Sequence, residues 1–150
     1  MINTNTYEQF QSQKYIGIGQ HLNIEKHLVS EDCSPHGHNY FEIELILSGT
    51  GIYSVNGTDY DVQTYNVFLS TPADFHQIQP ESEIHLLNLS FNEEILNDSM
   101  IVSLSSKKVM RAYAFDSATL VLLRSAFELL IEEHRIQGRC INLLCEYILE

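Results

Sequence analysis

The chain has 150 residues, a length typical of a single domain. Hydrophobic residues make up 44% of it and charged residues 19%, a composition that excludes disorder and low complexity. No run approaches the roughly 18 apolar residues of a membrane span, and the first residues lack the basic and apolar regions of a signal peptide. Its three cysteines form no CxxC pair, so we expect a protein of the reducing cytoplasm. Because no apolar run is long enough to span a membrane, we expect no membrane partner.

The charge balance narrows the range of partners. The formal net charge is −12, and nucleic-acid affinity comes largely from Lys and Arg that neutralise phosphates. We therefore expect no DNA or RNA binding by this chain alone. The stretch from His27 to Ser106 has twelve acidic residues and no Lys or Arg. A pocket built from that stretch has no fixed cation, which favours a neutral or cationic ligand, or a metal.

Short strands are predicted over the first two thirds of the chain. Apolar and polar residues alternate over residues 20–28 and 41–47, as in half-buried strands. A strand over 52–55 leads to Asn56-Gly57, a pair typical of a type I′ hairpin turn, and 58–62 is the returning strand. Further strands are expected over 67–70 and 84–91, with breaks at 71–74 and 79–81. This spacing predicts a mainly β sandwich or barrel.

The pattern becomes helical after Ala114. Asp116 or Ser117 is expected to cap a helix that ends at Gln137-Gly138, and a second helix is expected from Arg139 onward. We therefore assign residues 1–110 to a barrel and 111–150 to a helical hairpin that dimerises the protein or links it to another part. An apolar seam of the first helix either packs on the barrel or pairs with a second subunit, and we predict it as a dimer interface: Leu120, Leu123, Phe127 and Leu130.

The most specific feature is a set of possible metal ligands. His36 and His38, one residue apart on an extended chain, point to the same side and can share an ion, with Glu42 and His76 available to complete the site. On an unbroken strand Glu42 would lie roughly 13 Å from His38, so the chain must bend near Asn39, a residue that tolerates left-handed conformations. Alternatively, Glu42 and Glu44 lie on the wet face of a strand whose other, buried face carries Phe41, Ile43, Leu45 and Leu47.

These residues resemble the motifs of the cupin barrel. His36, His38, Glu42 and Gly49 match the first motif, and Thr71-Pro72-Ala73-Asp74-Phe75-His76 is similar to the second, with His76 as the third imidazole. The resemblance implies a site for a divalent metal such as Zn, Ni, Mn or Fe, although a receptor requires none. Ser30 and Asn66 replace usual glycines, and Pro80 replaces an expected Asn. Those departures are typical of a barrel that has lost catalysis.

A fuller resemblance covers roughly residues 36–150. The segments HNYFEIELILSGTGIYSVNGTDYDV, NVFLSTPADFHQI and LLNLSFNEEIL, followed by paired helices, resemble the N-terminal sensory domain of AraC-type transcription regulators. The resemblance implies a cupin-like double-stranded β-helix, or jelly-roll barrel, that binds a small effector and is followed by a dimerising helical hairpin. It also implies that DNA is bound only by a helix-turn-helix domain, which we expect after residue 150.

The family pattern also suggests which residues contact the effector. Tyr40, Tyr53 and Asn88 share the barrel interior on that pattern, with Leu86 as an apolar wall and His36, His38 and His76 nearby. Tyr hydroxyl and Asn amide groups suit a small neutral polar molecule, such as a sugar. We therefore expect a sensor and not an enzyme.

The alternative is a small metal-dependent cupin enzyme, an isomerase or dioxygenase, in which His36, His38, Glu42 and His76 hold the ion. The remaining histidines and the basic cluster of Lys107, Lys108 and Arg111 are expected on the surface.

Overall fold

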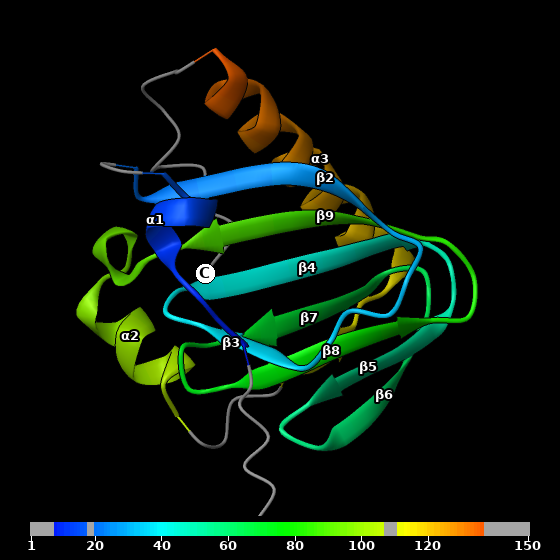
Figure 1. The fold of residues 1–150 in the computed structure, drawn as a ribbon. Helices are drawn as coiled ribbons and strands as arrows, with labels where there is room; N and C mark the ends of the chain where they lie inside the picture. The colour runs from blue at the N-terminus through cyan, green and yellow to red at the C-terminus, as the bar shows by residue number, and fades with distance from the viewer. Residues whose placement is uncertain (1–7, 18–19, 107–110, 137–150) are drawn as a thin grey trace, which may run out of the picture.

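The structure is a computed structural model that describes residues 8–17, 20–106 and 111–136 (Figure 1). Its core is two five-stranded sheets. One sheet has the order β1-β3-β8-β5-β6, with β1 Glu8–Phe10, β3 His36–His38, β8 Phe75–Pro80, β5 Gly51–Val55 and β6 Thr58–Val62. The other has the order β10-β7-β4-β9-β2, with β10 Ala112–Ala114, β7 Asn66–Ser70, β4 Phe41–Ser48, β9 Ile84–Phe91 and β2 Leu22–Val29.

The predicted strands are confirmed. Those expected near 20–28, 41–47, 52–55, 58–62, 67–70 and 84–91 correspond to β2, β4, β5, β6, β7 and β9. Asn56 and Gly57 have φ values of 50° and 81°, as a type I′ turn between β5 and β6 requires. The sequence analysis missed β8, because its few apolar residues are interrupted by Gln77 and Gln79. It also missed the short strands β1 and β10.

The two sheets enclose a core of buried side chains. Ile46, Phe68 and Leu86 come from the β10–β2 sheet, and Tyr53 and Ile78 come from the other, and all five belong to one apolar cluster. Residues on the inner faces of both sheets thus pack together, as in a jelly roll. The chain is therefore mainly β with a cupin-like barrel.

Helix α3, Ser117–Arg135, covers the outer face of the β10–β2 sheet (Figure 1). Asp116 caps it, because its carboxylate accepts a hydrogen bond of 2.8 Å from the Thr119 backbone N–H. Leu120, Phe127 and Leu130 are buried, and Leu123 partly so, in a cluster with Phe41, Leu45, Leu87, Leu89 and Phe91. The second predicted helix, from Arg139, lies outside the described residues.

This packing corrects the assignment of the α3 seam. Leu120, Leu123, Phe127 and Leu130 were predicted as a dimer interface, but they form the contact between the helix and its own barrel. The physical reason is that the sheet beneath α3 has an apolar outer face of its own, which must be covered. The large apolar side chains that α3 exposes are instead Val121, Leu122 and Leu129, followed by Ile136 just after its end.

Shorter elements complete the described chain. Helix α1, Ser12–Tyr15, follows β1. A 3-10 helix, Glu93–Ile95, and helix α2, Asp98–Leu104, lie between β9 and β10 in the sequence. Among the described helices, none has the length and apolar character needed to cross a membrane.

Candidate functional site

The inner face of the β10–β2 sheet is polar where β2, β9 and β4 lie side by side. One cross-strand row is formed by Glu25, Asn88 and Glu44, and the next by Asn23, Ser90 and Glu42. Glu42 and Glu44 are only 8% and 5% exposed, so the interpretation of these two residues as a wet strand face is wrong. Because α3 covers the other face of β4, both faces of this strand are buried.

The chain bends between His38 and Glu42, as the spacing required. Strand β3 ends at His38 and β4 begins at Phe41, and the bend brings His38 Nε2 to 3.5 Å from Glu42 Oε2. Asn39 has no positive φ, so the expected left-handed conformation is not used. The bend is held by α1 and β1 instead: Asn39 Oδ1 accepts a bond of 2.7 Å from Ser12 N–H, and the Asn39 N–H donates to the Phe10 carbonyl over 3.2 Å.

His38, Glu42 and His76 form a buried triad. Their ligand atoms lie within 4.8 Å of one another, and His76 Nε2 is 3.4 Å from Glu42 Oε2. His76 reaches this place because β8 is paired with β3 on one side and β5 on the other. The sequence motifs therefore identified three residues that the fold brings together.

The triad fits a metal ion. His38 Nδ1 donates a hydrogen bond of 2.6 Å to the Tyr40 carbonyl, which can only accept, so the neutral ring has its free lone pair on Nε2. His38 Nε2 and His76 Nε2 are buried without hydrogen-bond partners. Two imidazole nitrogens and one carboxylate oxygen form a donor set that Zn, Ni, Mn and Fe all accept.

Glu42 remains ionised in this environment. Burial raises its pKa, but the His38 and His76 rings and the Asn88 amide stabilise the carboxylate, and the net pKa is lowered to about 2. Burial lowers the pKa of His76 to about 3, so that ring is neutral at physiological pH. The Glu42 carboxylate is also held by the 2.8 Å hydrogen bond that Asn88 Nδ2 donates to its Oε1.

The pKa of Glu44 is shifted in the opposite direction from that of Glu42. Burial and the charge of Glu42 raise the pKa of Glu44 to about 8. The Tyr53 hydroxyl donates a hydrogen bond of 2.5 Å to Glu44, and it also lies 2.6 Å from His76 Nδ1. Tyr53 is thus a buried polar link between Glu44 and the triad, and the pKa of its hydroxyl is raised by burial.

His36 lies beside the triad but outside its set of ligand atoms. Its Nδ1 lies 2.8 Å from the Ser34 carbonyl, and its ring is 4.3 Å from the His76 ring centre. The predicted four-residue metal site is therefore corrected to three residues. The physical reason is that His36 Nδ1 is directed at the Ser34 carbonyl and the Cys33 thiol, whereas His38 and His76 each direct Nε2 at Glu42.

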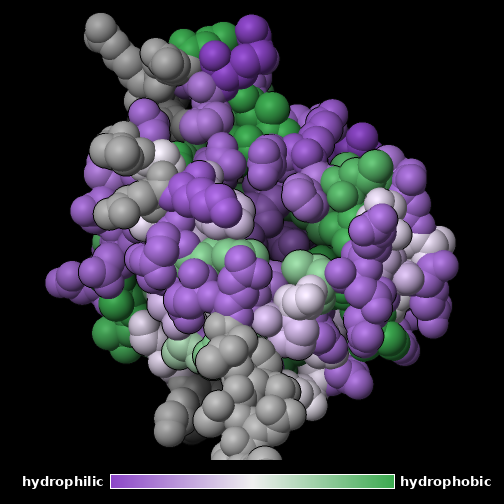
Figure 2. Space-filling view, viewed as in Figure 1, coloured by the Kyte–Doolittle hydropathy of each residue, from purple (hydrophilic) through white to green (hydrophobic). Residues whose placement is uncertain are grey.

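A cavity of about 400 Å³ opens next to the triad. Figure 2 shows a hollow on this face that is edged mainly by hydrophilic residues. Of the predicted ligand contacts, Tyr40, Asn88, His36 and His76 line the cavity. Tyr53, Leu86 and His38 are not among its lining residues, and each is 0% exposed.

The sequence analysis missed part of the cavity wall. Glu25 and His27 line it from β2, and Phe10 and Tyr15 line it from the N-terminal segment. His27 was expected on the surface. Asn23, Glu25 and His27 are two residues apart, and this alternation could have placed them on the same face as Glu42 once β2 was paired with β9.

Asp74 and Arg111 form a separate, structural pair. Arg111 Nε donates to Asp74 Oδ2 over 3.0 Å, and its side chain is only 17% exposed, which corrects the expectation that Arg111 lies on the surface. Asp74 also accepts hydrogen bonds from Asn56 and from the backbone and side chain of Thr71. Lys107 and Lys108 lie outside the described residues.

The sequence is similar to a known protein family and to a known protein. Residues 20–143 match the family described as the AraC-like ligand binding domain. A stretch of 56 residues is 32% identical to the "Uncharacterized HTH-type transcriptional regulator YfiF" of Bacillus subtilis (strain 168), and the match covers 37% of this chain and 18% of that protein.

About half of the chain also aligns with solved structures. A predicted oxalate decarboxylase from Thermotoga maritima is 22% identical with a TM-score of 0.43, and the alignment covers 46% of this chain and 64% of that one. An RmlC-like cupin from Shewanella frigidimarina is 14% identical with a TM-score of 0.46, and the alignment covers 49% of this chain and 68% of that one.

Proposed function

Because the chain belongs to the family of AraC-like ligand-binding domains, we propose that it senses a small-molecule effector in the cavity of its barrel. The observation that carries this proposal is the cavity itself, whose polar wall is built from neighbouring strands: Asn23 on β2, Asn88 and Ser90 on β9, and Glu42 on β4. Such concave sites with a few convergent polar groups are where small ligands bind.

The effector is small and polar, and it is not an anion. Amide, hydroxyl and carboxylate groups on the wall can orient the hydroxyl groups of a sugar-like molecule, as expected from the sequence. The described lining residues include no Lys or Arg, so an anion would meet carboxylates without a compensating charge.

Binding to the cavity is tested with one polar wall residue. Asn23 lines the cavity from β2, and Asn23→Leu removes its amide but keeps a side chain of similar size. An effector found by thermal-shift screening of small polyols should bind the variant more weakly by about tenfold, the loss of one hydrogen bond. Gln63→Leu, an exposed position outside the cavity, is the control. Equal loss in both variants would contradict the assignment.

We also propose that the protein dimerises through α3. In this proposal it is a cytoplasmic protein whose effector binding controls a DNA-binding domain outside this chain. Leu122, Leu129 and Ile136 are exposed and follow one another at seven-residue intervals, the repeat of a helix that pairs with a second copy. The opposite face of α3 is fixed to the barrel. A helix held on both sides can transmit an effector-dependent shift to a helix-turn-helix domain.

A second function, that of a metal-dependent cupin enzyme, is favoured by one observation. The Nε2 atoms of His38 and His76 are unpartnered and lie 3.5 Å and 3.4 Å from Glu42 Oε2. A bound ion would supply Lewis-acid or redox chemistry, and His38, Glu42 and His76 would hold it. Tyr53 and Asn88 would orient His76 and Glu42.

Metal analysis distinguishes the two functions. Protein purified without added metal should contain little metal and show no turnover if it is a sensor. Stoichiometric iron, manganese or nickel that is lost in His38→Ala and His76→Ala, together with turnover, would establish the enzyme instead. A structural metal inside a sensor would raise the melting temperature without turnover.

A further inference from the structure

We propose that the effector carries a primary ammonium group, which binds at Glu42 with His76 and His38, while its polar body lies along β9. This inference rests on the proposed function and specifies the chemical class of the effector. Four acidic residues line the cavity: Glu25, Glu31, Glu42 and Glu44. The described lining residues have no Lys or Arg to balance these groups.

Three acceptor atoms converge at one end of the cavity. Glu42 Oε1 is occupied by Asn88, but Oε2 faces the unpartnered Nε2 atoms of His38 and His76. The Nε2 of His38 has a lone pair because its Nδ1 proton is donated to the Tyr40 carbonyl. His76 Nδ1 lies 2.6 Å from the Tyr53 hydroxyl, so Nε2 is the ring atom that His76 presents to Glu42.

The number and spacing of these acceptors match an ammonium group. The three atoms lie within 4.8 Å of one another, so one nitrogen placed among them is at hydrogen-bond distance of about 2.8 Å from each. A primary ammonium has three N–H donors, one for each acceptor, and a positive charge for Glu42. A hydroxyl has one donor and would leave two buried acceptors unpaired.

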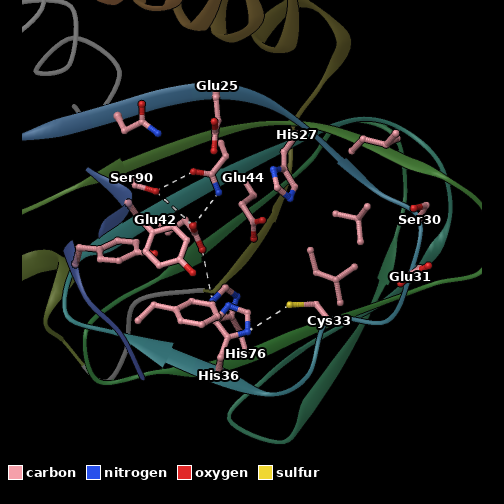
Figure 3. A pocket seen from close by; sticks show the side chains of 18 residues that line it. Glu25, His27, Ser30, Glu31, Cys33, His36, Glu42, Glu44, His76 and Ser90 are labelled. Carbon is pink, nitrogen blue, oxygen red and sulfur yellow. Dashed lines mark hydrogen bonds and ion pairs between the residues drawn. The ribbon is translucent and has the colours of Figure 1, made fainter. Parts of the chain in front are cut away.

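The cavity lets an ammonium group reach Glu42 and His76, and its wall can contact the rest of the ligand. Glu42 and His76 line the cavity directly, whereas His38 is fully buried behind them. In Figure 3, Glu25, Glu42 and Glu44 lie on one side of the space and His36 and His76 on the other. Asn88 and Ser90 line the wall between Glu25 and Glu42, and hydrogen bonds join them to each other and to Glu42, so hydroxyl groups of the ligand would contact this network.

Aromatic rings add to the preference for a cation. Phe10, Tyr15 and Tyr40 line the same cavity, with ring centres 4.9 Å apart for Phe10 and Tyr15 and 6.2 Å apart for Tyr15 and Tyr40. The faces of such rings attract cations. Lys14 Nζ already lies 5.2 Å from the centre of the Tyr15 ring, and Lys14 itself is not a lining residue.

The test compares molecules that differ only in charge. The 150-residue chain is treated with a chelator and titrated calorimetrically with two matched series: glucose, glucosamine and glucuronate, and benzyl alcohol, benzylamine and benzoate. We expect each amine to bind at least about tenfold more tightly than its neutral partner, since charge-assisted hydrogen bonds are roughly twice as strong. The carboxylates should not bind.

Two variants assign the effect to the site. Glu42→Gln keeps the shape and removes the charge, so the preference for the amine should fall to about onefold. If that buried variant does not fold, Glu25→Gln on the exposed part of the wall should reduce the preference by a smaller factor. Glu81→Gln, an exposed carboxylate that does not line the cavity, is the matched control and should keep it.

The outcomes separate this inference from the proposed function. Neutral members that bind as tightly as the amines would overturn the inference and leave the sensor intact. Failure of all six molecules to bind would count against both the cavity as a receptor and the inference. Zn²⁺ binding at the triad without binding of either amine would overturn the inference and identify the three acceptors as a metal site.

Discussion

His38 Nε2 lies 3.5 Å from Glu42 Oε2, and in the neutral form of His38, whose Nδ1 donates to the Tyr40 carbonyl, both of the facing atoms are acceptors. Two acceptors in contact inside a barrel repel each other unless a cation or an additional proton lies between them. This pair is therefore the point at which the interior of the protein selects for positive charge.

Zn²⁺ binding tests whether His38, Glu42 and His76 can act together as metal ligands. We expect chelated protein to bind Zn²⁺ in a calorimetric titration, and His38→Ala or His76→Ala to weaken this binding at least tenfold, because each removes one of three ligands. His36→Ala is the matched control, and it should bind almost as well because His36 is outside the set of ligand atoms. Equal losses in all three variants would contradict the three-residue site.

The raised pKa of Glu44 predicts that the protein loses stability as the pH rises from about 4.5 to about 8. The pKa of Glu44 is about 8 in the folded protein, whereas the ordinary pKa of a glutamate is 4.5. Between these values the folded state holds more protons, so the free energy of unfolding falls as pH rises, by at most about 1.4 kcal/mol per pH unit for this group.

Glu44→Gln should remove that contribution, because an amide stays neutral at every pH. Urea denaturation of both proteins at pH 5 and pH 8 checks the expectation. The variant should gain stability relative to the natural protein on going from pH 5 to pH 8. A parallel change in both proteins would show that Glu44 is ionised in the folded state well below pH 8.

The two faces of α3 should respond differently to substitution. Leu129 is 57% exposed and its neighbour Leu130 is fully buried. We expect Leu129→Glu to convert a dimer into a folded monomer, measured by sedimentation, with the melting temperature of the barrel retained. Leu130→Ala should instead destabilise the protein by about 2–5 kcal/mol. A natural protein that is monomeric at high concentration would refute dimerisation through α3.

The Asp74–Arg111 pair should contribute substantially to stability. Arg111 Nε lies 3.0 Å from Asp74 Oδ2, and the Asp74 side chain is only 2% exposed. Removing one partner of a buried pair costs about 3–5 kcal/mol, so Asp74→Ala should approach that loss in urea denaturation. Arg124→Ala removes an exposed pair with Glu128 and should cost no more than about 0.5 kcal/mol. Similar losses would show that Asp74 is not a structural centre.

Strands β2, β4, β5, β6, β7 and β9 and helix α3 could be predicted from the sequence because their signals are local. Alternation of apolar residues, the Asn56-Gly57 turn and the Asp116 cap each depend on a few neighbouring residues, and the structure confirms them. Strand β8 escaped prediction, since its two buried residues, His76 and Ile78, make no apolar repeat of their own.

The spacing of histidines and glutamate also determined, without the fold, that a bend must bring His38 and Glu42 together. The tertiary structure decided which face of each strand is interior and which side of α3 is free. Glu42 and Leu45 alternate on one strand, and either face could have met water. Only the docking of α3 on one face and the second sheet on the other buried both, because strand periodicity separates two faces but does not say what covers them.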